Sequence, residues 1–249
     1  MNVLPNRIGF YKPLAQISKG EMATIYQARD VRNQSLVALK VLSTKFAHNP
    51  SIADNFAMQA LTTQKLRHPG IVAIYDSGFA DGFVYMAMEY AEGGTLKEWL
   101  LDRNGPPRLD EALAVLEKMA NALDYVHENG YLHGNLSASN ILLTNDGRIL
   151  LSDFRGQYSK ENNYARVPVG GMPPAGNEGD GEGIYSDILN FGKIAYLIFT
   201  GRELSPINNH PNELSHYIAE LPEFLTKTNP FVDPSVAAVL QRALQNTPH

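Results

Sequence analysis

The stretch that decides the fold is YLHGNLSASNILL at residues 131–143, followed after a short turn by LSDF at residues 151–154. The runs ILLT and ILLSDF are short and apolar, which is typical of strands, and turn-forming Asn145, Asp146 and Gly147 separate them. The sequence therefore predicts a small hairpin that follows directly on a polar loop, HGNLSASN.

Helical patterns flank this stretch on its N-terminal and C-terminal sides. In DEALAVLEKMANALDYVHENG the apolar spacing predicts one buried stripe before a glycine stop, and SDILNFGKIAYLIFTG repeats the pattern. A third helical pattern, SVAAVLQRAL, lies near the end of the chain. The residues expected on the two buried faces are Leu113, Leu116, Ala120, Leu123 and Val126 in the first, and Ile188, Phe191, Ala195 and Ile198 in the second.

The first hundred or so residues are mostly typical of strands. The segments 11–26 and 36–42 carry β-branched and aromatic residues around the polar turn VRNQS, and IVAIYDSGF and GFVYMAMEY form a further pair. Between them SIADNFAMQALTTQKL has helical spacing that Pro69 and Gly70 end. The fold class is therefore α+β, a small sheet with one main helix followed by a mainly helical part, with the boundary near residues 91–95.

The composition narrows the class of protein. Among 249 residues, 44% are hydrophobic and 19% charged, as in an ordinary globular protein, and the formal net charge of -5 argues against nonspecific nucleic-acid binding. Cysteine is absent, which excludes disulfides and thiol catalysis and fits a reducing compartment. No apolar run is long enough to cross a membrane, so we expect no membrane span within this chain.

Several motifs occur in one order: VALK at 37–40, MEYAEGGTL at 88–96, the HGNLSASN loop, LSDF, and SDILNFGKIAYLIFTGRE at 186–203. This ordered set resembles the eukaryotic-like Ser/Thr protein kinases, above all their bacterial Hanks-type branch, over most of the chain. The resemblance implies a bilobal protein-kinase fold in one domain, residues 1–249. The N-lobe would span about residues 1–90, the hinge about 89–95 and the C-lobe about 96–249, and we expect the natural polypeptide to continue past the C-terminal end.

The resemblance also implies a nucleotide pocket. Lys40 matches the strand lysine that contacts the α and β phosphates, and Asn140 and Asp153 match the two magnesium ligands. Gly20 matches the middle glycine of the phosphate-covering loop, in which Ser18 and Ala23 replace the other two. Backbone groups of Glu89 and Ala91, beside the pocket-gating Met88, would meet an adenine.

Five positions depart from the active pattern. Asn135 stands where the catalytic aspartate accepts the substrate proton, and an amide is not a usable base at neutral pH. The other four departures replace the arginine that receives a loop phosphate, the lysine near the transferring phosphate, the helix glutamate that pairs with Lys40, and the glycine after Phe154: Gly134, Ser137, Gln59 and Arg155.

Other matches have structural interpretations. His133 and Phe154 correspond to buried residues that link the lobes, Thr63 takes a helix position usually filled by an apolar side chain, and Asp187 corresponds to an aspartate that braces the catalytic-loop backbone. For Lys40 and Asp153 two hypotheses stay open: they bind a Mg-nucleotide, or they pair with each other, with Arg155 beside Asp153. The acidic segment GGMPPAGNEGDGEG is expected to be a solvated loop, and Tyr158, Ser159 and Tyr164 surface residues.

From these departures the sequence predicts no enzyme but a pseudokinase, a regulatory or scaffolding domain in bacterial signalling that binds a protein partner and requires no cofactor. Two alternatives remain: a switch that binds ATP and magnesium without chemistry, and an atypical, weakly active Ser/Thr protein kinase. The expected location is the cytoplasm, either alone or as the cytoplasmic domain of a larger, membrane-tethered protein.

Overall fold

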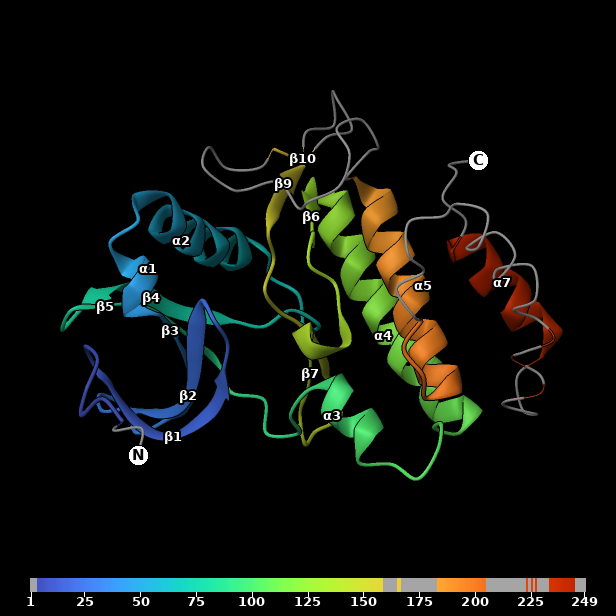
Figure 1. Cartoon of the computed structure of the whole chain (residues 1–249), viewed down its shortest axis with the longest axis horizontal. Helices are drawn as coiled ribbons and strands as arrows, with labels where there is room; N and C mark the ends of the chain where they lie inside the picture. The colour runs from blue at the N-terminus through green and yellow to red at the C-terminus, as the bar shows by residue number, and fades with distance from the viewer. Residues whose placement is uncertain are drawn as a thin grey trace.

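The computed structural model describes residues 4–158, 165–166, 183–204, 223, 225, 227 and 233–244. A strand-rich N-lobe with one main helix lies beside a mainly helical C-lobe, and the polar loop between β6 and β7 faces the junction of the two (Figure 1). The predicted α+β class and bilobal protein-kinase fold are confirmed.

The N-lobe sheet is antiparallel. Its strands are β1 (Tyr11–Lys19), β2 (Ala23–Asp30), β3 (Leu36–Leu42), β4 (Ile74–Ala80) and β5 (Phe83–Glu89), in the order β1-β2-β3-β5-β4. The segment 11–26 predicted as strand is thus a hairpin, whose turn at residues 20–22 contains the single glycine of the phosphate-covering loop.

Strand β3 shows why the VALK motif has its residue types. Successive side chains of a strand point to opposite faces, so Val37, Leu39 and Val41 enter the core on the outer face of the sheet. Ala38 and Leu42 belong to separate clusters on the opposite face, where α2 and the cleft lie. Lys40 shares this face by alternation, which directs its ammonium group between the lobes.

Helix α2 (Pro50–Lys65) covers the inner face of the sheet after a short helix α1 (Thr44–Ala47). Asn49 caps α2 by accepting a hydrogen bond from the backbone N–H of Ile52, and proline at the first turn suits a helix start. Phe56 and Ala60 are the helix residues that pack with Leu42 and Met86 of the sheet. The helix predicted in this region is confirmed.

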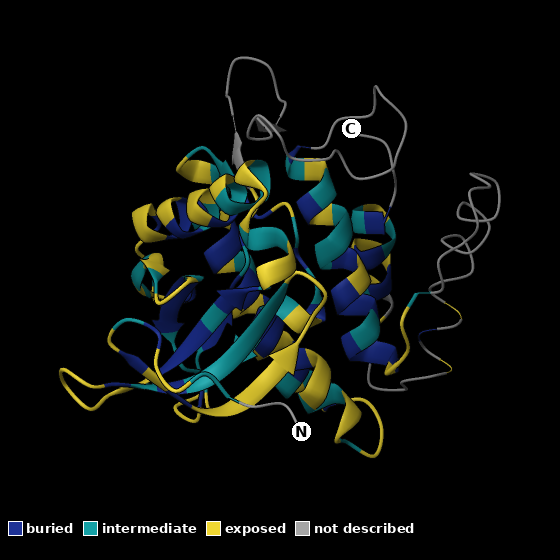
Figure 2. Cartoon of the chain, turned by 60° about the vertical axis from the view of Figure 1, so that its left-hand side comes forward, coloured by how far each residue is buried: buried dark blue, intermediate teal, exposed yellow. Residues whose placement is uncertain are grey.

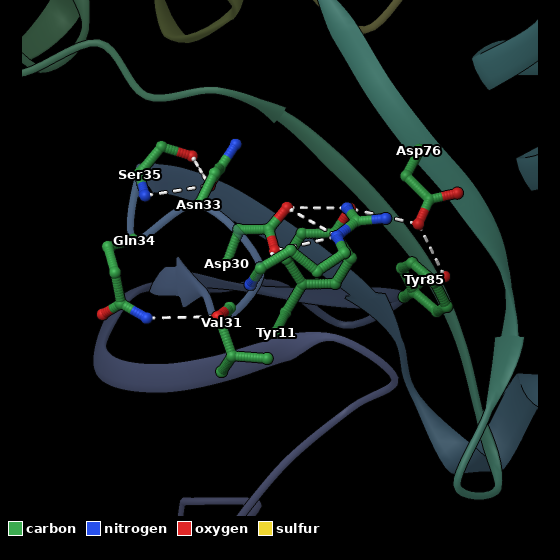
Figure 3. A network of polar contacts seen from close by, with 9 residues as sticks. Tyr11, Asp30, Val31, Asn33, Gln34, Ser35, Asp76 and Tyr85 are labelled. Carbon is green, nitrogen blue, oxygen red and sulfur yellow. Dashed lines mark hydrogen bonds and ion pairs between the residues drawn. The ribbon is translucent and has the colours of Figure 1, made fainter.

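A network of polar side chains fastens the outer face of the sheet (Figure 3). The Asp76 carboxylate accepts hydrogen bonds from the Tyr11 and Tyr85 hydroxyls at 3.1 and 3.0 Å, and Arg32 donates to Tyr11 and pairs with Asp30. The network joins β1, β2, β4 and β5 beneath the exposed residues of β1, which are yellow in Figure 2. Buried polar groups need hydrogen-bond partners, and each of these side chains finds at least one within the network.

The C-lobe is built on two long helices, α4 (Leu109–Glu128) and α5 (Ile184–Thr200), which lie side by side, with α7 (Pro234–Leu244) against α5 (Figure 1). All three predicted helices are confirmed. Short elements complete the lobe: α3 (Leu96–Leu101), a 3-10 turn (Ala138–Asn140), and the strands β6 (Tyr131–Leu132), β7 (Ile141–Leu143), β8 (Ile149–Leu151), β9 (Gly156–Tyr158) and β10 (Ala165–Arg166).

Two residues that were predicted to lie on buried helix faces are exposed. Leu113 is 45% exposed and Ile188 is 40% exposed. In α4 the buried stripe runs instead through Ala112, Val115, Met119, Ala122 and Val126, shared with Leu116 and Leu123. Each of the two exposed residues directly follows a buried residue, Ala112 in α4 and Asp187 in α5, and one step along a helix turns the side chain by about 100°, away from the buried face.

The acidic segment lies outside the described residues except for its last residue, Gly183, and so do Ser159 and Tyr164. Among the described helices, none combines the length and the apolar character that crossing a bilayer requires.

Candidate active site

The site centres on an ion pair between the two lobes. The Lys40 ammonium of β3 lies 2.6 Å from Oδ1 of Asp153, and the two side chains are only 12% and 25% exposed. The Phe56 ring of α2 flanks the same ammonium, 5.9 Å from its centroid. Of the two hypotheses from the sequence, the direct pairing of Lys40 with Asp153 is the arrangement in this structure.

Asp153 has an unusual backbone conformation. Its φ angle is +63°, in the left-handed region that non-glycine residues rarely adopt and that is enriched at active sites. The residue before it is held firmly, because Ser152 donates from both its backbone N–H and its hydroxyl to the Asn140 carbonyl at 2.9 Å. The strained residue is therefore held in place by a fixed neighbour, with its carboxylate directed at Lys40.

Asp187 of α5 holds the polar loop from beneath. Its buried carboxylate accepts hydrogen bonds from the backbone N–H groups of His133 and Gly134 at 2.8 and 2.9 Å, and His127 of α4 contacts it at 2.9 Å. The bracing role expected of Asp187 is thus confirmed.

Asn135 connects the remaining polar residues of the site. Its carbonyl accepts a 2.7 Å hydrogen bond from the Asn140 side chain, and its own amide group lies 3.5 Å from the Asp153 carbonyl. Asn140 therefore turns its side-chain nitrogen to the loop and keeps its oxygen for another partner. Magnesium prefers oxygen ligands together with nucleotide phosphates, so the Asn140 and Asp153 oxygens, with Lys40 for a phosphate, fit a Mg-nucleotide.

An apolar wall adjoins these polar groups at the hinge. Met88 is 4% exposed and packs with Ala38 and Leu150, and Ile25, Tyr90, Ala91 and Leu142 contact this cluster. Ile25 and Ala38 come from the N-lobe sheet and Leu142 from β7, so both lobes contribute to the wall. Such apolar walls with a few polar groups are typical of ligand sites. Met88 is thus a buried core residue beside the hinge, and its gating of a nucleotide pocket stays a prediction.

The hinge supplies a backbone donor. The Ala91 N–H has no hydrogen-bond partner among the described residues, and Ala91 is half-buried. Glu89 differs, because its side-chain carboxylate forms an ion pair with Arg148 at 2.8 Å and its backbone N–H donates to the Ala73 carbonyl at 2.8 Å.

The positions that depart from the active pattern lie around this site. Gln59 is half-buried on α2, one turn beyond Phe56, and within the described part of the chain it forms no hydrogen bond with Lys40. Gly134 has φ +65°, a conformation in which an arginine would be strained. Ser137 immediately precedes the 3-10 turn, and Gly20 donates its N–H to Ala23 across the β1–β2 turn.

Arg155 does not pair with Asp153. Its side chain is exposed and forms no ion pair with any residue that the structure describes, while its backbone N–H donates to the His133 carbonyl at 2.8 Å. The polar pair at Asp153 is therefore formed by Lys40 without Arg155.

Behind the site, His133 and Phe154 pack ring against ring at 4.6 Å, both fully buried, and Thr63 on α2 is 4% exposed. The Thr63 hydroxyl satisfies itself within the helix by donating to the Gln59 carbonyl. Burial lowers the pKa of His133 to about 4, so this imidazole is neutral at physiological pH. A structural role for His133 agrees with the expectation from the sequence.

The profile of the protein kinase domain family matches residues 11–249 of the chain. The chain belongs to the protein kinase family. Serine/threonine-protein kinase PrkC of Bacillus subtilis is 32% identical over 249 residues, which cover 96% of this chain and 38% of PrkC. PknB of Mycobacterium leprae is 29% identical over 241 residues, covering 92% of this chain and 38% of PknB. The chain thus spans well under half the length of these kinases.

The fold comparison agrees with this assignment. The crystal structure of the Mycobacterium tuberculosis PknI kinase domain superposes with a TM-score of 0.69 and 25% identity, covering 98% of this chain and 92% of that one. Membership in the bacterial Hanks-type branch, expected from the motifs, is confirmed by the relatives.

One prediction from the sequence is overturned by these comparisons. The departures at Asn135, Arg155 and their neighbours led us to predict no enzyme, whereas relatives at 28–32% identity along nearly the whole protein kinase domain are named serine/threonine-protein kinases. The physical reason for the error is that most of the work in phosphoryl transfer is positioning, and the positioning residues Lys40, Asn140 and Asp153 are retained.

Proposed function

We propose that this protein kinase domain transfers the terminal phosphoryl group of a Mg-nucleoside triphosphate to serine or threonine hydroxyls of a protein, at a slow rate. The observation that carries the proposal is the 2.6 Å contact between Lys40 and Asp153 across the lobes. It brings a phosphate-binding cation and a metal-binding carboxylate together beside the hinge.

Each retained residue has a role in binding. With a Mg-nucleotide bound, the Lys40 ammonium would contact the phosphates, and the Asp153 carboxylate and the Asn140 oxygen would hold magnesium, which would supply charge neutralisation for the phosphates. Ile25, Ala38 and Leu142 would contact the adenine, with the Ala91 N–H as its donor.

Asn135 explains why the rate is slow. Its amide accepts a hydrogen bond from the substrate hydroxyl and orients it, but cannot take the proton. General base catalysis contributes roughly 10²–10⁴-fold, and the loose transition state of phosphoryl transfer tolerates its loss because little proton transfer has occurred at that point. The proton leaves for water after transfer.

The direct test is transfer of radiolabelled phosphate from ATP, with Mg²⁺ or Mn²⁺, to the protein itself and to casein. We expect slow incorporation at serine and threonine that Asp153→Ala abolishes, because that substitution removes the metal ligand. Phosphoamino-acid analysis identifies the acceptor. Incorporation no higher than in Asp153→Ala would refute the proposal.

A second candidate is favoured by the same ion pair. Nucleotide competes with Asp153 for Lys40, so binding changes a contact between the lobes and could set the affinity for a protein partner without chemistry. A ligand shifts such an equilibrium only by its differential affinity for the two states. Partner affinity that is unchanged at saturating nucleotide would eliminate the switch.

We place this function in one domain, residues 1–249, whose lobes meet at about residues 89–95. We further propose that the domain works in the cytoplasm, where nucleoside triphosphate is abundant, as part of a longer signalling protein like the relatives it matches. Its partner is the protein that carries the acceptor hydroxyl.

A further inference from the structure

Arg148, in the β7–β8 turn of the C-lobe, lies between two carboxylates that come from different lobes. Its Nη1 is 2.8 Å from Oε1 of Glu89, the last residue of β5, and its Nε is 2.9 Å from Oδ2 of Asp146. The partners Glu89 and Arg148 are 59 residues apart in the sequence. No resemblance or motif in the sequence singles out this contact.

The turn that carries Arg148 is rigid. The buried Thr144 hydroxyl donates to the Asp146 carboxylate and accepts from the Arg148 backbone N–H at 2.9 Å. Lys118 of α4 donates to the Gly147 carbonyl at 2.8 Å, which ties the turn to the C-lobe core. The guanidinium is therefore held in place before it meets Glu89, so little side-chain entropy is lost in the contact.

Glu89 is fixed on its other side as well. Its backbone N–H donates to the Ala73 carbonyl at 2.8 Å, and its side chain is only 17% exposed. Further along the hinge, the Gly93 N–H donates to the Leu143 carbonyl and the Gly94 carbonyl accepts from the Leu143 N–H, both at 2.9 Å. The hinge is thus attached to the β7–β8 hairpin at residue 89 and again at residues 93–94, which leaves residues 90–92 as its unattached part.

We propose that Arg148 is a positioning residue for nucleotide binding: it holds Glu89 so that residues 90–92 present the Ala91 N–H beside Leu142. This inference rests on the nucleotide site proposed above and adds a residue outside it. The arrangement with Arg148 engaged is also the one in which Lys40 and Asp153 meet. Loss of the contact shifts the lobes toward an open arrangement that binds nucleotide poorly.

An ordinary surface ion pair would have no such effect, and the chain offers a matched control. Lys97 and Glu203 pair at 2.9 Å with side chains 45% and 68% exposed, and both belong to the C-lobe. Exposed pairs of this kind contribute little. Arg148→Gln removes the same single positive charge as Lys97→Gln, but the Arg148 side chain contacts Glu89 of the other lobe.

The test measures Mg–ADP affinity by calorimetry for the wild type, Arg148→Gln, Arg148→Lys and the control Lys97→Gln. We expect about tenfold weaker binding in Arg148→Gln, partial recovery in Arg148→Lys and less than a twofold change in the control. A merely structural role would lower the melting temperature without this ordered series in affinity.

A second readout needs no nucleotide. Since the chain has no cysteine, spin labels at Lys12→Cys in β1 and Glu117→Cys in α4 report the distance between the lobes alone. We expect a broader and longer distance distribution in Arg148→Gln than in the wild type or Lys97→Gln. If the wild type binds Mg–ADP and Arg148→Gln changes neither the affinity nor the distance distribution, only the proposed role of Arg148 is overturned. Absence of Mg–ADP binding by the wild type overturns the proposed function and this inference with it.

Discussion

Lys40 and Asp153 satisfy each other's charge across the two lobes, 2.6 Å apart and largely shielded from solvent. A buried charge that loses its partner is costly, whereas removal of both charges is cheaper than the sum of the two single losses. Each of the two charges therefore depends on the other, and one of them can turn to a ligand only if the other also finds a new partner.

The first prediction is a coupling between these two residues. In urea unfolding, Lys40→Met and Asp153→Asn should each destabilise the protein, and the double variant should lose about 1–2 kcal/mol less than their sum. The same cycle on the exposed pair Lys97 and Glu203 serves as control, with coupling below about 0.5 kcal/mol. Additive losses at Lys40 and Asp153 would mean that the pair is not formed in solution.

The second prediction concerns the missing base. The backbone carbonyl of Asn135 accepts a hydrogen bond from the Asn140 side chain, and Asn135→Asp keeps this contact while it gives up the 3.5 Å contact of the Asn135 side-chain amide with the Asp153 carbonyl. We expect kcat for phosphotransfer to rise by about 100-fold, with a new acid limb in the pH–rate profile as the carboxylate protonates. Asn135→Ala should not show this gain. An unchanged rate in Asn135→Asp would mean that proton removal does not limit transfer.

The third prediction is a pH dependence of stability. The pKa of His133 is about 4 in the folded protein against about 6.5 when unfolded, so the unfolded chain binds a proton more readily between these values. The contribution of His133 to the free energy of unfolding is fully present above pH 6.5 and is lost as the pH falls toward 4, by on the order of 3 kcal/mol. Chemical unfolding of His133→Phe across this range should show a flatter dependence. If His133→Phe keeps the wild-type slope, the acid sensitivity originates in other groups.

The fourth prediction tests the close approach of the hinge to β7. A Cβ atom added to Gly93 would lie 2.8 Å from the Leu143 carbonyl oxygen, a backbone atom that cannot rotate away. Gly93→Ala should therefore cost about 1–3 kcal/mol in thermal or chemical unfolding. Gly78→Ala, where the new atom meets only ordinary contacts at 3.9 Å, should cost less than about 1 kcal/mol. Equal costs would show that the hinge relaxes away from β7.

The order of elements and the fold could be predicted because their signals are local or motif-based. Period-two strands, helical stripes and glycine stops predicted the N-lobe sheet, α2, α4 and α5 close to their observed bounds. The errors at Leu113 and Ile188 arise because the buried positions are the preceding residues, Ala112 and Asp187, and an apolar pattern does not predict a buried aspartate.

The site was predicted in part for a similar reason. Motif spacing identifies Lys40, Asn140 and Asp153, but the apolar wall of Ile25, Ala38 and Leu142 has the appearance of core residues in ordinary strands. Arg148 was missed entirely, because a turn arginine two residues after an aspartate carries no signal of a partner 59 residues away. Such contacts depend on tertiary structure alone.

Asp187 has a consequence for how this domain can change over evolutionary time. The path of the loop at residues 133–134 is set by a carboxylate on α5, through backbone N–H groups that every amino acid except proline possesses. The side chains that determine the chemistry of this loop do not take part in that bracing. Substitutions such as the one at residue 135 can therefore accumulate or revert singly while the loop keeps its shape, so catalytic strength is a trait that can be tuned in small inherited steps on an unchanged framework.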